Sequence, residues 1–308
     1  MKRLLLLLFL LPTIAFGQTT LIPDANFEQR LIDLSYDTGT PDGSVPTANI
    51  GTITSLYVSN ENIADLTGIE DFIALEQLSC DYNQLTSLDI SQNAALVSLG
   101  VRHNDLDSLN ISNNPALKYV LCTGNQLSHI EVGAAPLLQS LECESNQLQE
   151  IEVSGALSLE VLDCQNNLIT DLDLSSNTSL AWLRCSSNQL YCLNIKNTNI
   201  TFTYPNDTNF VVLNNTNLSC IEVDDVVMAS NWVFPFSWHV DSTTSFSENC
   251  NYPTPCVSGT TAIKELSQPK HLLYITDLLG RTTQRVPNTL LFYIYEDGSV
   301  EKKIQLER

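Results

Sequence analysis

Residues 75–200 consist of six consecutive copies of a 21-residue pattern. The first position of every copy is leucine, at Leu75, Leu96, Leu117, Leu138, Leu159 and Leu180. The ninth position of every copy is asparagine, at Asn83, Asn104, Asn125, Asn146, Asn167 and Asn188. A fixed period in the low twenties is typical of a solenoid, whose coils stack on one another to bury a continuous core.

Each copy carries two short apolar sets. The first set occupies positions one, four and six, as in Leu138, Leu141 and Cys143, and its period of two predicts a short strand with one buried face. Successive copies then place their strands side by side in a parallel sheet. A second set, at positions eleven, fourteen and sixteen, folds back over the same core. We expect the asparagine side chains to satisfy buried backbone groups where the strand ends, and to bond the asparagines above and below.

The repeated LxxLxCxxNQL pattern resembles the leucine-rich repeat family, with Cys in place of the family's third Leu. A degenerate copy precedes it, so the resemblance covers residues 53–200. It implies a right-handed leucine-rich repeat coil with a parallel β-sheet. It specifies a scaffold and leaves the function open. The degenerate copy is carried by Ile53, Leu56, Val58, Asn62, Ile63 and Leu66.

Five cysteines occupy the sixth position of their copies, and Val101 takes that position in the remaining copy. Stacked strands hold neighbouring Cα atoms about 4.8 Å apart with parallel side chains, whereas a disulfide needs Cβ atoms about 3.8 Å apart and turned toward each other. We therefore expect buried thiols that act as small apolar residues. The alternative is a ladder of metal ligands, but soft-metal sites need four converging ligands. The column comprises Cys80, Cys122, Cys143, Cys164 and Cys185.

The N-terminal 52 residues precede the repeats. Residues 1–17 have a basic start, an apolar run and a small-residue site, which predicts a secretory signal peptide that is removed before Gln18. Residues 18–52 are expected to form a helical N-terminal cap, with Asp24 as the N-cap of a helix over 22–34. Asp37, Asp42 and Ser44 in the next loop offer clustered oxygens for calcium. The alternative is a plain turn built by Asx and Gly residues.

The chain after residue 200 loses the period. Residues 201–250 are expected to supply one or two irregular coils and a C-terminal cap, closed by a disulfide between Cys220 and Cys250. The pairing of Cys192 and Cys256 stays open. We expect apolar side chains of this segment to cover the last coil, namely Val223, Val226, Val227, Trp232, Phe234 and Trp238. The motifs NxxNLSCIEVDD and FSENC resemble the C-terminal cap of secreted leucine-rich repeat proteins of the Bacteroidetes.

Residues 251–260 form a predicted linker, and residues 261–308 differ in character from the rest. This tail holds 7 basic and 6 acidic residues. Its apolar strands and turns resemble the C-terminal sorting domain of the type IX secretion system of Bacteroidetes, through Asp277, Leu279–Arg281, Tyr293–Tyr295 and Asp297–Gly298. The resemblance implies a small β-sandwich-like module that is read by the secretion machinery. The alternative is an ordinary accessory β-module.

Residues 18–260 are strongly acidic, with 29 Asp and Glu against 5 Lys and Arg. This charge argues against nucleic acid and anionic membranes as partners. No segment after the signal is apolar enough to span a membrane. We expect the protein to be secreted or held at the outer cell surface.

Catalytic motifs are missing from the sequence. The four histidines lie in different modules, and no HExxH, GxSxG, phosphate loop or metal-spaced Cys/His cluster is present. Glu142 and Glu144 share one strand face, but hydrolysis of glycosides needs two carboxylates across an enclosed cleft. We therefore expect no enzyme and no cofactor.

The outward positions of the strands offer an extended binding face instead. Aromatic and arginine side chains are enriched at binding hot spots. The candidate contact residues are Arg102, Tyr119, Leu121, Trp182 and Arg184. The sequence thus favours an exported, non-enzymatic leucine-rich repeat protein that binds an extracellular protein or glycan. The alternatives are a structural or adhesive surface protein without one ligand and, third, a polysaccharide or peptide hydrolase.

Overall fold

The structure, a computed structural model, describes residues 18–196, 209–232 and 238–252, together with four strands between 272 and 304. The chain divides into two compact units, Met1–Gly259 and Thr260–Arg308. The predicted signal peptide 1–17, the linker beyond residue 252, Cys256 and most of the tail's turns lie outside the described residues. No helix in the described part of the chain is long and apolar enough to cross a membrane.

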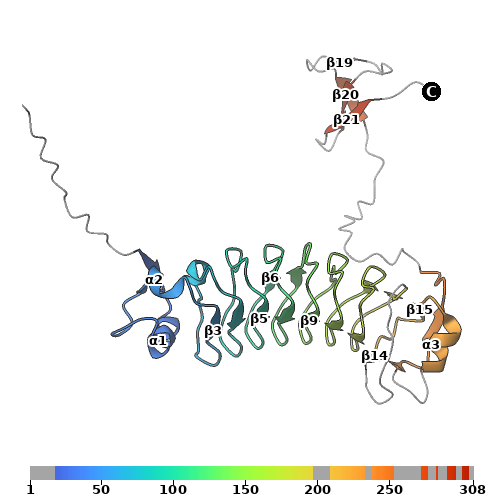
Figure 1. Cartoon of the computed structure of the whole chain (residues 1–308). Coiled ribbons are helices and arrows are strands. Elements are labelled where there is room, and N and C mark those ends of the chain that lie inside the picture. Colours follow the sequence, from blue (N-terminus) through green and yellow to red (C-terminus); the bar gives the residue numbers. More distant parts are fainter. Residues whose placement is uncertain are drawn as a thin grey trace, which may run out of the picture. The chain divides into compact units, whose positions relative to one another are not determined.

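A nine-stranded parallel sheet runs along the first unit, and its strands follow one another in chain order, one per coil (Figure 1). The predicted strand position is confirmed, because each repeat forms a three-residue strand centred on its position-four residue. Neighbouring strands pair in register, so that Tyr119 lies beside Ser140 and Val161 lies beside Trp182. The strands are β3 (Ser55–Tyr57), β4 (Gln77–Ser79), β5 (Ser98–Gly100), β7 (Tyr119–Leu121), β9 (Ser140–Glu142), β10 (Val161–Asp163), β12 (Trp182–Arg184), β14 (Phe210–Val212) and β16 (Trp238–Val240).

The second apolar set forms shorter parallel ladders on the returning side of the coil in the second, third, fifth and sixth copies. One ladder pairs β6 with β8, and another has the order β11, β13, β15, β17. In these two ladders the chain folds back over the core. Their bounds are β6 (Ser108–Asn110), β8 (His129–Glu131), β11 (Asp171–Asp173), β13 (Cys192–Asn194), β15 (Cys220–Glu222) and β17 (Ser245–Ser247).

The leucine and cysteine columns form one continuous core. The five ladder cysteines are fully buried and free, as predicted. Burial raises the pKa of the Cys122 thiol to about 12, because a thiolate would lose its hydration. Burial raises the pKa of the Cys143 and Cys164 thiols well above their ordinary range for the same reason. The column therefore packs as small apolar side chains.

The asparagine column bonds backbone groups of the preceding coil. The amide nitrogen of Asn146 donates to the carbonyls of Cys122 and Cys143, and its oxygen accepts from the Leu127 amide at 3.0 Å. The expectation of bonds between neighbouring asparagine side chains is therefore wrong. Where each strand ends, backbone carbonyls and amides are buried inside the bend. The asparagine side chain forms its hydrogen bonds with these backbone groups and not with the neighbouring asparagines.

A left-handed residue precedes the asparagine in each of the six copies. The φ angles at this eighth position are positive, for instance 57° at Ser145 and 53° at Asn166. Only in the third copy is it glycine, Gly124. This bend turns the chain sharply enough to bring the following asparagine inward. In the degenerate copy Asn62 itself has a φ of 57° and is exposed, so it does not take the buried role.

The N-terminal part contains the helix expected over 22–34. Helix α1 (Ala25–Asp33) starts at Asp24, whose side chain accepts from the amides of Asn26 and Phe27. The other carboxylate oxygen of Asp24 accepts from the amide of Ala64 in the first coil. Phe27 and Leu31 are buried in the common core. The remaining elements are β1 (Thr19–Leu21), β2 (Ser44–Pro46), α2 (Thr47–Ile50) and the 3₁₀ helix η1 (Ile69–Asp71).

The coils continue beyond residue 200. Strands β14 and β16 extend the nine-stranded sheet, and β15 and β17 extend the returning ladder. Asn215 takes the place of the next ladder asparagine, since its side chain donates to the Cys185 carbonyl and accepts from the Leu190 amide. Asp241 then accepts from the amide of Asn215. The predicted irregular coils thus have the same asparagine-to-backbone hydrogen bonds at their bends as the regular repeats.

The end of the first unit contains α3 (Val226–Trp232) and the predicted disulfide. Cys220 and Cys250 are bonded, with their Cα atoms 5.9 Å apart. Cys192 is also disulfide-bonded. Val227 is 72% exposed, so its expected role in covering the last coil is wrong. Phe234 lies outside the described residues.

The second unit contains one antiparallel sheet of four strands in the order β19, β18, β20, β21. The alternation of apolar residues predicted strands in this tail, and the structure places them there. A β-sandwich stays a prediction. The bounds are β18 (Leu272–Thr276), β19 (Thr282–Thr283), β20 (Leu290–Tyr295) and β21 (Val300–Ile304).

Candidate binding face

The outward side of the nine-stranded sheet, called the strand face below, is formed by positions three, five and seven of each coil. The pairing register aligns these positions in rows. One row runs Tyr119, Ser140, Val161, Trp182, and the next runs Leu121, Glu142, Asp163, Arg184. The four position-four residues between these rows point inward, because side chains alternate along a strand.

The predicted apolar contact residues lie on this face, although only one of them has more than a third of its surface exposed. Tyr119 is 44% exposed, whereas Leu121 and Trp182 are half-buried by their neighbours. Tyr119 and Trp182 belong to β7 and β12, with β9 and β10 between them. At a strand spacing of about 4.8 Å, these two aromatic residues flank a stretch of about 14 Å.

The two predicted arginines are tied to carboxylates of the face. The Arg102 guanidinium donates to Asp81 Oδ2 from both Nε and Nη2, at 3.2 and 2.9 Å. This bidentate contact raises the pKa of Arg102. Arg184 Nη1 lies 3.8 Å from Asp163 Oδ2, and its guanidinium lies 4.6 Å from the centre of the Trp182 ring. The structure therefore positions both cations at opposite sides of a group of acidic residues.

Glu142 and Glu144 lie between the two arginines. Partial burial raises the pKa of both carboxyls, and the neighbouring charge of Asp163 raises each further. Arg102 and Arg184 act in the opposite direction on Glu142, and their effect is smaller. Burial without a partner makes the charged form of a carboxylate costly. The sequence placed these glutamates on one strand face but gave them no binding role.

The remaining candidate groups serve the scaffold. Asp42 Oδ1 accepts from the backbone amide and hydroxyl of Ser44, both at 3.1 Å, which is the geometry of the alternative Asx turn. No bond or contact in the described loop brings Asp37 to Asp42. Within the described residues, no three His, Cys, Asp or Glu side chains are grouped to hold a metal ion.

The described histidines are not brought together. His103 stacks on Tyr82 with ring centres 4.5 Å apart, and His129 Nε2 lies 3.4 Å from Glu131. His239 belongs to β16, and His271 lies outside the described residues. The geometry shows no nucleophile and base within reach of each other on the described strand face.

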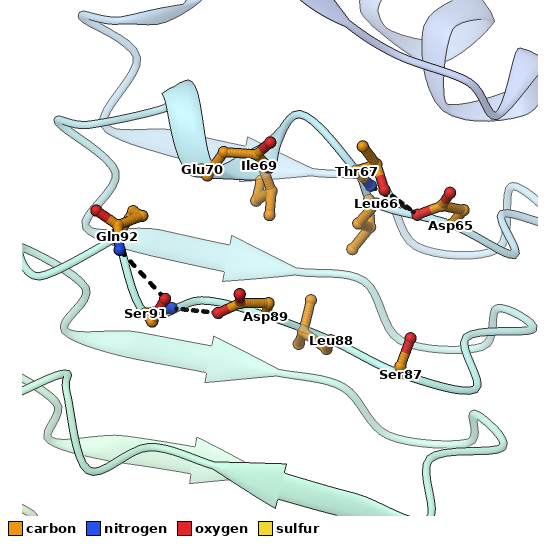
Figure 2. Close-up of a pocket in the computed structure, with 10 residues that line it drawn as sticks. All are labelled: Asp65, Leu66, Thr67, Ile69, Glu70, Ser87, Leu88, Asp89, Ser91 and Gln92. Atoms are coloured by element: carbon orange, nitrogen blue, oxygen red, sulfur yellow. Dashed lines mark hydrogen bonds between the residues drawn. The ribbon is translucent and has the colours of Figure 1, made fainter.

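A hollow of about 330 Å³ lies between the first two coils, away from the strand face (Figure 2). Its carboxylates are occupied by their own turns. Asp65 Oδ1 accepts from the Thr67 amide at 2.8 Å, and Asp89 Oδ1 accepts from the Ser91 amide at 2.9 Å, as Figure 2 shows. The bonds from Ser91 lower the pKa of Asp89. These groups stabilise turns, so the strand face is the better candidate for binding.

One strand per 21 residues, a buried leucine column and a ladder of asparagines on backbone groups together identify the scaffold. The chain folds as a leucine-rich repeat solenoid. Its sequence is 38% identical over 85 residues to internalin J of Listeria monocytogenes serotype 4b (strain F2365). That match covers 26% of this chain and 9% of internalin J, so it concerns a small part of that protein. No family model matches the leucine-rich repeat chain.

Solved leucine-rich repeat structures match this chain at low sequence identity and with TM-scores below 0.5. The functional domain of InlJ from Listeria monocytogenes, which includes a cysteine ladder, matches with a TM-score of 0.37 and 23% identity, covering 76% of this chain and 64% of that domain. Internalin C2 from Listeria monocytogenes strain 4b F2365 matches with a TM-score of 0.49 and 21% identity, covering 67% and 98%. A leucine-rich repeat protein of Leptospira interrogans matches with a TM-score of 0.37 and 19% identity, covering 56% and 62%.

Proposed function

We propose that the protein binds a protein partner through the strand face and catalyses no reaction. The observation that carries this proposal is the row from Tyr119 to Trp182, which presents aromatic side chains at both ends and Ser140 and Val161 between them. Aromatic side chains contribute large contact areas at binding sites. Leucine-rich repeat proteins in general bind other proteins, which supports the same conclusion.

Substitution of the two aromatic residues tests the proposal. We expect Tyr119→Ala and Trp182→Ala each to weaken capture of the partner from outer-surface extracts by at least about tenfold, as loss of a hot-spot residue does. Tyr57→Ala is the matched control, because Tyr57 is 53% exposed on β3 of the same sheet. Capture that is equal for all three variants would contradict the proposal and favour a structural or adhesive protein. Capture of polysaccharide alone would place the ligand among the glycans.

We further propose that the protein is exported and belongs to the secreted type of the Bacteroidetes, with residues 261–308 as a type IX sorting domain. The basic and apolar start of the sequence and the motifs around Gly280 and Asp297–Gly298 support this proposal. Deletion of residues 261–308 is expected to leave the repeat region in the periplasm of its host, as fractionation and immunoblotting would show. Normal appearance of the truncated chain outside the cell would exclude the sorting role.

A further inference from the structure

The middle of the strand face carries three neighbouring carboxylates, Glu142, Glu144 and Asp163, called the acidic patch below. Asp163 has Arg184 at 3.8 Å, and the other nearby cation, Arg102, is bound to Asp81. Among the described residues, Glu142 and Glu144 have no ion pair within 4 Å and accept no hydrogen bond through their side chains. Arg102 and Arg184 act on these carboxyls only from beyond ion-pair distance, so the two glutamates lack a direct cationic partner at a partly buried position.

Two hydroxyls beside the patch also lack partners. Ser140 and Thr123 are each only 9% exposed, and no described residue donates a hydrogen bond to either hydroxyl or accepts one from it. Ser140 lies between Tyr119 and Val161 in its row and points to the same side of β9 as Glu142. Neither hydroxyl oxygen is among the fully enclosed polar atoms, so both are open to a ligand that approaches the strand face. Free acceptors beside carboxylates that have no ion pair are the arrangement expected where a cationic group binds.

We infer that the acidic patch binds a lysine or arginine side chain of the protein partner. The inference rests on the proposed function and specifies the chemistry of its ligand. Glu142 and Glu144 provide the negative charge, and the Ser140 hydroxyl provides a neutral acceptor for a further N–H group. Tyr119 borders the patch on one side and contacts the alkyl stem of the incoming side chain, which stays apolar along its length.

An organic cation fits the patch better than a metal ion. A divalent ion requires several carboxylate or carbonyl oxygens converging on one point, and the described residues contain no such group. A lysine or arginine side chain instead donates its N–H groups to acceptors spread over a wider area, and it approaches from the open side of the sheet. The excess of acidic residues in the repeats also attracts a basic partner and speeds its association.

The patch has a stability cost that separates a binding role from a structural one. Burial raises the pKa of Glu142 and Glu144, so their charged forms destabilise the unbound fold at neutral pH. The isosteric double variant Glu142→Gln/Glu144→Gln removes this charge and keeps the side-chain shape. We expect its urea midpoint to equal or exceed that of the wild type, while its affinity for a basic ligand falls.

A displayed library of random dodecapeptides is the probe, selected against the full chain. We expect the selected peptides to contain Lys and Arg at least about three times as often as the input library, and their binding to weaken as NaCl rises. A synthetic copy of one selected peptide should lose at least about tenfold in affinity on the Glu142→Gln/Glu144→Gln variant. Glu150→Gln/Glu160→Gln is the matched control, because it removes two exposed carboxylates that lie outside the strand face.

The outcomes distinguish this inference from the function on which it rests. Selected peptides without excess Lys and Arg that nevertheless lose binding on Tyr119→Ala would overturn the inference and leave the proposed binding face intact. Equal loss on the patch variant and on the control would also overturn it, because general electrostatics would then explain the effect. Peptides that bind equally to the wild type and to Tyr119→Ala and Trp182→Ala would count against both.

Discussion

At the scale of single residues, the ninth-position asparagines contribute most clearly to this solenoid. Asn146 uses its amide nitrogen on carbonyls of two coils and its oxygen on the Leu127 amide of the earlier coil. One side chain thus joins two coils, and it is the only described partner of the Leu127 amide, whereas the Cys122 and Cys143 carbonyls also accept from Asn125 and Asn167. Backbone groups in a buried bend are costly when they lose their partners.

Replacement of Asn146 by alanine should therefore lower the free energy of unfolding by about 3 kcal/mol, since the Leu127 amide loses its only described partner and the Cys122 and Cys143 carbonyls each lose one of their two asparagine donors. Gln147→Ala is the control, because Gln147 is the next residue and its side chain is exposed. Urea denaturation followed by far-ultraviolet circular dichroism measures both changes. A loss for Asn146→Ala no larger than that of Gln147→Ala would contradict the role assigned to the asparagine column.

The sequence predicted the ninth-position asparagines but missed a second set. Asn93, Asn114 and Asn177 are fully buried at position nineteen, and Asn114 donates to the carbonyls of Ile90 and Asn93. Alanine fills this position in the third and fourth copies, at Ala135 and Ala156. The second ladder is therefore interrupted, and an interrupted column is hard to distinguish from the ordinary polar residues of a turn.

The element that sets the chemistry of the core is the cysteine column behind the strands. Its thiols were predicted correctly from the strand spacing alone, because that spacing holds for every parallel sheet. The partners of the side chains on the strand face were not predictable in the same way. The Arg102 contact with Asp81 depends on rotamers, which the repeat pattern does not specify, and so does the absence of an ion pair for the Glu142 carboxylate among the described residues.

The thiol column should make the fold sensitive to alkali. An unfolded thiol has a pKa of 9.0, and burial raises the folded value for Cys122 to about 12. A raised folded pKa stabilises the fold below pH 9, and this contribution is lost as the pH rises toward the folded value, because the unfolded state releases its proton first. Each such thiol lowers the free energy of unfolding by up to about 1.4 kcal/mol per pH unit above pH 9.

Urea midpoints measured between pH 8 and pH 10 test this prediction. The slope with pH, rather than the absolute stability, is the readout, because Cys122→Ala also leaves a small cavity. We expect the stability of the Cys122→Ala variant to fall less steeply with pH than that of the wild type, because one buried thiol fewer is present. Identical slopes for the wild type and the variant would show that the Cys122 thiol does not titrate on unfolding. Tyr252 adds a similar effect above pH 10, since burial raises its pKa from 10.0 to about 12.

The first unit as a whole is a linear stack in which each coil packs on the coils before and after it (Figure 1). In such a stack the stability is close to a sum of coil and interface contributions. The period of 21 residues also fixes which side chains meet when coils are removed. Deletion of residues 117–158 removes two whole copies and places Leu159 directly after Ala116. Asn177 then meets the carbonyls of Ile111 and Asn114, in the way that Asn114 now meets those of Ile90 and Asn93.

This shortened chain should therefore fold, with a lower urea midpoint than the wild type but with a cooperative transition and a β-rich circular dichroism spectrum. Deletion of residues 117–148 is the control, because it removes one and a half copies and puts the two apolar sets out of register. That variant is expected to aggregate or to lose its cooperative transition. The 117–158 deletion also removes Tyr119, Glu142 and Glu144, so it should fold and yet fail to bind the partner. Equal behaviour of the two deletions would mean that the coils are not interchangeable units.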